Sequence, residues 1–298
     1  MKDRLPLVIN TEVGGKKVLV RGDMDVDDGD NPRANSVREM VRWLLGKKAG
    51  KVKVIGHTGT ALNLASQLQE EFVGVEFDDK LRDNPGETQN VEEFARRISS
   101  GWEVYVNEAF ATSHRLHASI ISLPQVMKRQ GKDVCLGLRF GKEIEMLSQV
   151  WDKPGRRVLV IGGVKVGDKQ RLAEVMRGKF AAVLKGGLLP GVELRPDGLD
   201  LADGVIENYV KVIGEAEVIV AAGVMGKYED PNAEKGTRMI LEAIAASPAY
   251  KVAGGGDIEM AISQYGLTGK FDWISVGGGA MLEYLATGTL PGIEAMYT

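Results

Sequence analysis

Two lysines spaced four residues apart follow an apolar stretch near the middle of the chain. Residues 158–161 are branched aliphatic residues, which is typical of a strand buried on both faces. Two glycines at 162–163 let a ligand approach the backbone, and Lys165 and Lys169 come next, before a helix predicted to start near Arg171. The stretch lacks the Gly-Lys-Ser/Thr of a Walker loop. It indicates a polyphosphate-binding turn, and the alternative is an ordinary strand-to-helix turn with two solvated lysines.

Six basic side chains lie in or beside loops that follow predicted strands in the first half of the chain. They are Arg21, Arg33, His57, Arg82, His114 and Arg115. Guanidinium groups suit the planar, bidentate recognition of carboxylates and phosphates. A surface salt bridge would explain any one arginine equally well. Their convergence on strand ends predicts a pocket that binds anions.

The three histidines of the chain, His57, His114 and His117, all lie just beyond predicted strands. A zinc site built on them would be expected to include a cysteine or an H-E-x-x-H pattern, and neither accompanies them. We therefore predict that these histidines do not ligate a metal ion.

Composition narrows the class of protein further. The chain has 298 residues, of which 44% are hydrophobic and 27% charged, as in an ordinary globular protein. A net charge of −3 argues against a nucleic-acid binder, which would carry a basic excess. The single cysteine, Cys135, allows no intrachain disulfide and is expected to be a small buried hydrophobe. No apolar run suggests a membrane span or a signal peptide, so a cytoplasmic protein is expected.

Strands and helices alternate along both halves of the chain, and many of the strands end in glycines. The predicted strands are 17–21, 52–55, 73–77, 103–106, 158–161, 181–184, 217–220, 250–253 and 272–276. A helix predicted at 137–150 separates the two halves. These repeated units predict an α/β fold with two doubly wound parallel-sheet, Rossmann-like domains joined by an interdomain helix and a hinge.

Several motifs resemble, in the same order and over nearly the whole chain, those of the phosphoglycerate kinase family. They are residues 18–26, 105–110 with 118–119, 162–169, 254–257, 277–280 and 290–293. The chain is shorter than usual family members. The trimmed segments lie between His57 and Arg82 and between Gly187 and Asp203.

The resemblance implies a phosphotransferase of glycolysis and gluconeogenesis. Such an enzyme moves a phosphoryl group reversibly between 1,3-bisphosphoglycerate with ADP and 3-phosphoglycerate with ATP, and its partners are small molecules. The resemblance implies that a domain at 1–140, completed by the tail 286–298, binds phosphoglycerate. It implies that a domain at 141–285 binds MgATP or MgADP, that hinge closure joins the two, and that the protein is a monomer.

The resemblance also implies roles for individual residues. By position, the phosphoglycerate site is Asp23, Asp25, Arg33, His57, Arg82 and Arg115. The nucleotide site is Gly162, Gly163, Lys165, Lys169, Gly187, Glu229, Gly255, Gly256 and Asp257, with Asp257 as the Mg²⁺ ligand. The catalytic group is Arg33, Lys165, Gly256 and Gly279. These roles agree with the chemistry, because phosphoryl transfer needs positioning and positive charge more than a covalent intermediate.

Four positions depart from the family pattern. Asp25 replaces an asparagine, Thr60 an arginine, Ala222 an asparagine and Ile258 a hydroxyl residue. The segment that normally helps to line the adenine pocket, after Gly187, is also short. Two alternatives therefore stay open: a catalytically weak relative that binds nucleotide or a protein partner, and a kinase for a related carboxylate.

Overall fold

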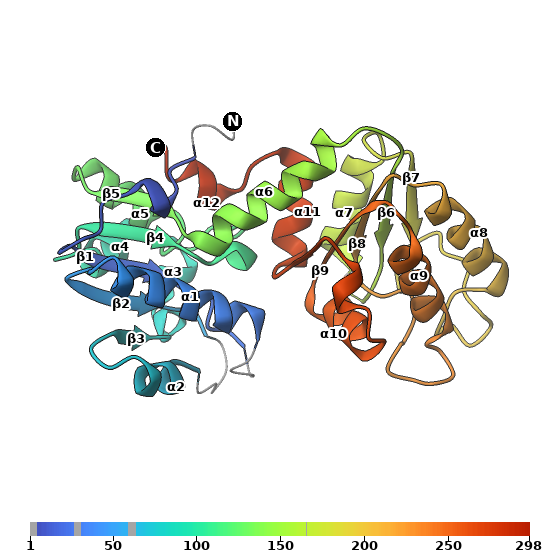
Figure 1. The fold of residues 1–298 in the computed structure, drawn as a ribbon, viewed down its shortest axis with the longest axis horizontal. Helices are drawn as coiled ribbons and strands as arrows, with labels where there is room; N and C mark the ends of the chain where they lie inside the picture. Colours follow the sequence, from blue (N-terminus) through green and yellow to red (C-terminus); the bar gives the residue numbers. More distant parts are fainter. Residues whose placement is uncertain (1–4, 27–30, 59–63, 165) are drawn as a thin grey trace. The chain divides into compact units, whose positions relative to one another are not determined.

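The computed structural model describes all residues except 1–4, 27–30, 59–63 and 165 (Figure 1). The chain forms two compact units. Unit 1 comprises Met1–Glu145 and Thr289–Thr298, and unit 2 comprises Met146–Gly288. Each unit is built on one five-stranded sheet in which all the paired strands are parallel. The predicted α/β class with two parallel-sheet domains is confirmed.

The sheet of unit 1 has the strand order β3-β2-β1-β4-β5. Its strands are β1 Lys17–Arg21, β2 Lys51–Ile55, β3 Glu76–Asp78, β4 Val104–Asn107 and β5 Asp133–Leu136. The sequence analysis did not predict β5, whose short apolar end pairs with β4. In β1 and β4 the runs of buried residues match strands covered by helices on both faces.

Helices and short 3-10 turns cover the sheet of unit 1. They are η2 Val8–Asn10, α1 Pro32–Gly46, α2 Leu64–Glu71, η3 Leu81–Asp83, α3 Pro85–Thr88, α4 Glu92–Ile98, η4 Phe110–Thr112, α5 Ser122–Arg129 and α12 Pro291–Glu294. At the start of α1, the Asn31 side chain accepts a hydrogen bond from the Arg33 backbone N–H, and Pro32 occupies the first turn. This cap fixes Arg33 in the first turn of α1.

The last ten residues belong to unit 1. The backbone N–H of Gly292 donates to the Ser113 carbonyl over 2.9 Å, and Lys128 Nζ donates to the Met296 carbonyl over 2.7 Å. Leu290, Ile293 and Met296 are buried. The tail is therefore part of the packing around the loop that follows β4.

The sheet of unit 2 has the order β10-β9-β8-β6-β7. Its strands are β6 Arg157–Ile161, β7 Ala182–Lys185, β8 Val218–Ala222, β9 Tyr250–Gly254 and β10 Trp273–Ser275. Its helices are α7 Val166–Met176, α8 Asp203–Gly214, α9 Lys235–Ala246, α10 Gly256–Gln264, η5 Thr268–Lys270 and α11 Gly278–Thr287. Helix α6, Leu138–Asp152, contributes residues to both units.

Helix α7 begins at Val166, five residues before the predicted start near Arg171. The β-branched Val166 and the flexible Gly167 are weak helix formers, so this segment was interpreted as part of a turn. As a consequence, Lys169 lies within the helix rather than in a loop before it.

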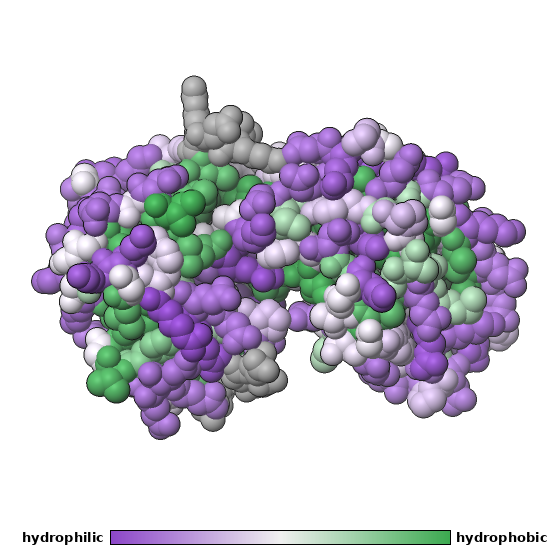
Figure 2. Space-filling view, in the orientation of Figure 1, coloured by the Kyte–Doolittle hydropathy of each residue, from purple (hydrophilic) through white to green (hydrophobic). Residues whose placement is uncertain are grey.

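Apolar side chains fill the interior of each unit, and most of the face of each unit in Figure 2 is hydrophilic. Within the described residues, no helix is long and apolar enough to cross a membrane.

One carboxyl group in the packing of unit 1 is buried and held by hydrogen bonds. The carboxyl of Glu108 is 2% exposed, and its Oε1 accepts hydrogen bonds from Ser36 Oγ (2.7 Å) and from the Arg139 backbone N–H (2.9 Å). Burial raises the pKa of Glu108 to about 8, although these hydrogen bonds oppose the shift. Glu108 therefore joins α1, the end of β4 and the start of α6 as a protonated carboxyl at neutral pH.

This protonation predicts a pH-dependent stability. The folded protein keeps the Glu108 proton up to a pKa of about 8, whereas the unfolded chain releases it near 4.5. The stabilising contribution of the Glu108 proton is full at pH values below the pKa of the unfolded chain. It is lost as the pH rises through the pKa of the folded protein. Comparing wild type with Glu108→Gln, we expect the free energy of unfolding of wild type to fall more steeply between about pH 5 and 8, by a difference on the order of 4 kcal/mol. Urea unfolding at several pH values measures this difference.

The control is Glu145→Gln, on helix α6, whose first turn contacts Glu108, because the Glu145 side chain is 60% exposed. It should keep the pH dependence of wild type. Parallel pH curves for wild type and Glu108→Gln would contradict the assignment of a buried, protonated Glu108.

Candidate active site

The side chains of the predicted basic pocket follow strands that end at one edge of the sheet in unit 1. Strands β2, β1 and β4 are neighbours and run parallel, so their carboxyl ends meet at this edge. Strands β2 and β3 are added on one side of β1, and strands β4 and β5 on the other side. The strand order therefore reverses at the boundary between β1 and β4, which is called a switch point. Open α/β sheets bind ligands outside the strand ends at such a point.

Asp23 and Arg33 face each other across the loop after β1. Arg33 Nε lies 3.6 Å from Asp23 Oδ2, and the Asp23 side chain is only 6% exposed, against 29% for Arg33. No described group makes a hydrogen bond to Asp23 Oδ2. Asp23 thus orients a guanidinium group that remains partly open to solvent, as expected for a group that meets an anionic ligand.

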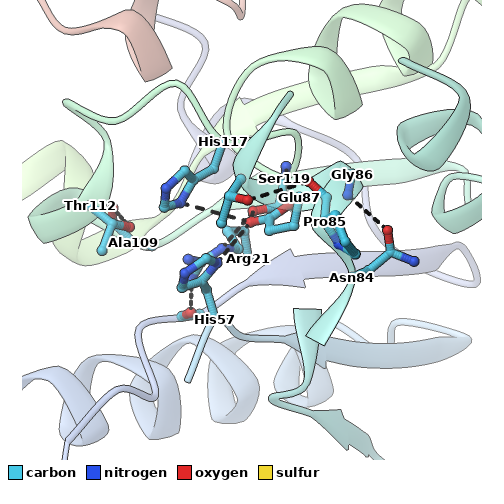
Figure 3. Close-up of polar contacts among 12 residues, drawn as sticks. Arg21, His57, Asn84, Pro85, Gly86, Glu87, Ala109, Thr112, His117 and Ser119 are labelled. Carbon is cyan, nitrogen blue, oxygen red and sulfur yellow. Dashed lines mark hydrogen bonds and ion pairs between the residues drawn. The ribbon is translucent and has the colours of Figure 1, made fainter. Parts of the chain in front are cut away.

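His57 belongs to a buried network at the end of β2 (Figure 3). Its Nδ1 lies 3.3 Å from Glu87 Oε1, and its ring stacks on that of His117 with centroids 4.4 Å apart and planes 16° apart. Ser119 donates to Glu87 twice, from Oγ to Oε1 over 2.6 Å and from its backbone N–H to Oε2 over 2.9 Å. Arg21 Nε in turn donates to Ser119 Oγ over 2.9 Å. The network joins the loops after β2 and β4 to the end of β1.

Burial and neighbouring charges set the protonation states in this network. Burial alone would raise the pKa of Glu87, but the hydrogen bond from His57, the charge of Arg21 and the bonds from Ser119 outweigh it and lower that pKa. The pKa of His117 falls to about 4, chiefly through burial and through the nearby His57. Glu87 is therefore ionised at neutral pH, and His117 is neutral.

The same network contains three side chains of types that can ligate a metal ion. One ligand atom each from His57, Glu87 and His117 lie within 4.8 Å of one another. The two rings are stacked nearly parallel, so an ion in the plane of one ring would lie well out of the plane of the other. The buried guanidinium of Arg21 adds positive charge next to the only carboxylate of the group. This geometry favours a hydrogen-bonded network over a cation site.

The remaining described residues of the predicted phosphoglycerate site lie in loops beyond the strand ends. Asp25, Arg82 and Arg115 are exposed. The turn that carries Arg82 is held beside the His57 loop, because the backbone N–H of Leu81 donates to the Gly56 carbonyl over 3.2 Å. Arg115 is near enough to His117 to lower its pKa. Thr60 lies outside the described residues.

A cavity of about 530 Å³ lies at the corresponding edge of the sheet in unit 2. Its lining includes Gly163 after β6, Gly187 after β7 and Met225 after β8, with Glu229 and Asp257 among its polar residues. Because β6 is the strand where the order of this sheet reverses, the cavity also lies at a switch point.

The other described residues predicted for unit 2, in the nucleotide site or the catalytic group, directly follow strands or lie in the first turns of helices. Lys169 Nζ donates to the Gly162 carbonyl. Gly255 precedes α10 with a φ of 116°, and Gly256 is the first residue of that helix. Gly279 is the second residue of α11. Lys165 lies outside the described residues.

The short segment after Gly187 does line the cavity. Leu188, Leu194 and Leu199 all face it, together with Val224. An apolar wall of this kind suits the flat faces of a nucleobase. The two departures in this unit are buried: Ala222 ends β8, and Ile258 packs in the core of unit 2. The side chain of Ile258 is therefore part of the packing.

Sequence reasoning missed the residues that organise the basic site. Glu87 is not among the residues that the sequence analysis selects, and Ser119 appears there only as part of a motif. Glu87 directly follows a Pro-Gly pair in the sequence and is nevertheless fully buried. A buried carboxylate in a polar loop has no signal in one sequence, because its partners come from strands far away along the chain.

Two parallel α/β units, one with basic side chains at its switch point and the other with a glycine-lined cavity, form the architecture expected of the predicted phosphotransferase. The sequence matches the family described as phosphoglycerate kinase over residues 29–194 and 190–288. The phosphoglycerate kinase of Bdellovibrio bacteriovorus is 34% identical, covering 74% of this chain and 70% of its own. That of Anaeromyxobacter dehalogenans is 31% identical, covering 95% and 97%. The chain belongs to the phosphoglycerate kinase family.

Solved structures agree on the fold. The phosphoglycerate kinases of Coxiella burnetii and Pyrococcus horikoshii each superpose with a TM-score of 0.82, at 22% and 24% sequence identity. The first comparison covers 99% of both chains, and the second covers 98% of both. The family membership makes this chain a phosphotransferase and links it to glycolysis.

Gly187 gives a test of the cavity wall. Its φ of 60° is in the left-handed region, and a Cβ there would lie 2.5 Å from the Gly163 backbone nitrogen. We expect Gly187→Ala to lower the free energy of unfolding by about 2 kcal/mol or more and to weaken MgADP binding, because both strain and a backbone clash result. Urea unfolding and calorimetric titration with MgADP measure the two effects.

The matched control is Gly191→Ala. Gly191 has a similar φ of 78°, but a Cβ there would meet nothing within 4 Å. The free energy of unfolding of Gly191→Ala should fall by only about 1 kcal/mol, and its affinity for MgADP should stay unchanged. If the two variants bind MgADP equally well, Gly187 does not shape the nucleotide site.

Proposed function

We propose that this protein catalyses reversible phosphoryl transfer between 1,3-bisphosphoglycerate with ADP and 3-phosphoglycerate with ATP. The observation that supports this most is the pairing of Asp23 with Arg33, at a switch point, in a member of the phosphoglycerate kinase family. In this proposal the basic site of unit 1 binds phosphoglycerate. The cavity of unit 2 binds the nucleotide, and a hinge closure brings the two substrates together.

The chemistry needs few protein groups. The ionised carboxylate of 3-phosphoglycerate attacks the γ-phosphorus of ATP. A bond forms between the carboxylate oxygen and phosphorus while the bond to the β-phosphate oxygen breaks, and ADP leaves with the electron pair. No general base is required, because the carboxylate is already ionised at neutral pH. Arg33 stabilises the charge on the transferring group, and Lys165 and Lys169 hold the nucleotide phosphates.

Asp257 is the residue proposed to hold Mg²⁺. It lies in the first turn of α10 and lines the cavity, and a carboxylate oxygen is the type of ligand that Mg²⁺ prefers. When bound, the ion neutralises charge on the nucleotide phosphates. The N-terminal residue of α10, Gly256, and Gly279 in the first turn of α11 present backbone to the same region. Closure of the hinge would exclude water, which would otherwise hydrolyse the acyl phosphate.

Two alternatives remain under this proposal, each with its own observation. Asp25 adds a negative charge beside an anion site, which favours a kinase for a related carboxylate. The buried Ile258 in place of a hydroxyl residue favours a catalytically weak nucleotide-binding relative. Turnover on another carboxylate would support the first, and MgADP binding without any turnover the second. We also propose a cytoplasmic monomer, and light scattering during size-exclusion chromatography tests the oligomeric state.

Replacement of Arg33 tests the proposed reaction. Turnover with MgATP and 3-phosphoglycerate, coupled to NADH oxidation, should be measurable in wild type. In Arg33→Ala we expect kcat to fall roughly 100- to 1,000-fold, because a contact made to the developing charge is lost. Arg42→Ala is the control: Arg42 lies on the same helix, its side chain is 61% exposed, and it pairs with Glu71. It should retain kcat, and an equal loss in both variants would contradict the role of Arg33.

Asp25→Asn tests the altered glycerate pocket. Removing one negative charge near the anion should lower the KM for 3-phosphoglycerate roughly fivefold, which corresponds to a repulsion of about 1 kcal/mol. Glu39→Gln removes an exposed charge elsewhere in unit 1 and should leave KM unchanged. A KM that rises in Asp25→Asn would mean that Asp25 contributes favourably to binding, which supports a different carboxylate substrate.

A further inference from the structure

The carboxylate of Glu87 contacts the two loops that form the proposed anion site. His57 comes from the loop after β2, whereas His117 and Ser119 come from the loop after β4. The backbone of Glu87 adds a further link, because its carbonyl accepts from the Ala118 N–H over 2.8 Å. Figure 3 shows these side chains pointing toward one another around the carboxylate. The Glu87 side chain is fully buried, so solvent does not compete for these contacts.

We propose that Glu87 is a positioning residue that holds His57 with its proton on Nδ1 and its Nε2 directed away from the carboxylate, toward the anion site. The effect on catalysis rests on the function proposed above. The assignment of the tautomer does not, because it follows from the hydrogen bonds in this network.

The tautomer follows from what each group can donate or accept. An ionised carboxylate only accepts hydrogen bonds, so the 3.3 Å contact with Glu87 requires a proton on His57 Nδ1. The lowered pKa of Glu87 keeps that carboxylate ionised at neutral pH. The neutral His117 ring stacked against His57 restricts its rotation. Nε2, on the far side of the ring, is then the nitrogen that can meet a ligand.

Glu87→Gln should reverse this arrangement. The side-chain oxygen must accept from the Ser119 backbone N–H at the present Oε2 position, because a donor there would face another donor. The amide NH₂ then takes the Oε1 position. It can donate to Ser119 Oγ and to His57, so His57 Nδ1 becomes an acceptor and the proton moves to Nε2.

The first test is nuclear magnetic resonance of ¹⁵N-histidine-labelled protein. The chain has only three histidines, so the spectrum can be assigned with His57→Asn and His117→Asn variants. We expect long-range ¹H–¹⁵N correlations to show a protonated Nδ1 for His57 in wild type and an unprotonated Nδ1 in Glu87→Gln. Ser119→Ala, which keeps the carboxylate, should retain the wild-type pattern. An unprotonated Nδ1 in wild type overturns the proposal.

The second test separates positioning from general structure. With Nδ1–H donating to Glu87, an anion can hydrogen-bond to Nε2 only if His57 takes up a second proton there, and the ionised Glu87 beside Nδ1 offsets that positive charge. In Glu87→Gln this compensating charge is lost. We expect Glu87→Gln to raise the KM for 3-phosphoglycerate roughly tenfold, with kcat changed less than about threefold and affinity for MgADP unchanged. Loss of kcat without a change in KM would contradict this role.

The proposed function and the proposed tautomer of His57 can fail independently. If wild type shows no turnover, the proposed function fails, while the spectra still decide the tautomer. Glu87→Gln leaves the buried Arg21 with less compensating charge and can fail to fold. In that case Glu87→Asp, which keeps the charge but shortens the reach to His57, replaces it. The wild-type spectrum alone then still supports or overturns the assignment.

Discussion

The order of the parallel strands is the constraint on which both sites depend. In each sheet, the first strand along the chain, β1 in unit 1 and β6 in unit 2, has later strands added on both sides of it. Loops that are remote in sequence must therefore leave the sheet side by side. Polar side chains spread from position 23 to position 117 meet at one edge for this reason. The ladder hydrogen bonds, rather than any contact between the polar side chains, bring them together.

Buried polar groups then fix these loops once the sheet has brought them together. The carboxylates of Glu87 and Glu108 are both buried, yet their protonation states differ. Glu87 receives hydrogen bonds from His57 and Ser119 and has Arg21 nearby, so its pKa is lowered. The hydrogen bonds to Glu108 stabilise its charged form less than burial destabilises it, so its pKa rises to about 8. One group thus supplies a fixed charge for the site, and the other supplies a neutral link between helices.

Sequence patterns predicted the fold class and most strands well, because buried parallel strands are short aliphatic runs ending in glycine. They failed where local propensity misleads. Helix α7 begins at Val166 despite the weak helix formers Val166 and Gly167, and β5 carries too short an apolar run to be recognised. The candidate residues could be found by resemblance, and Asp23, Arg33 and His57 do lie at one sheet edge. Glu87 could not, because its burial depends on contacts with Ser119 and His57 that only the folded chain creates.

The two sites differ in the kind of recognition they offer. Unit 1 presents charged side chains held by buried hydrogen bonds, which suits a small anion of defined geometry. Unit 2 presents backbone at glycines and an apolar wall, which suits a larger ligand that approaches the main chain closely. A single charge such as Asp25 therefore has most influence on which carboxylate is accepted in unit 1. In unit 2, shape has more influence, because a Cβ at Gly187 would meet backbone and no flexible side chain could move aside.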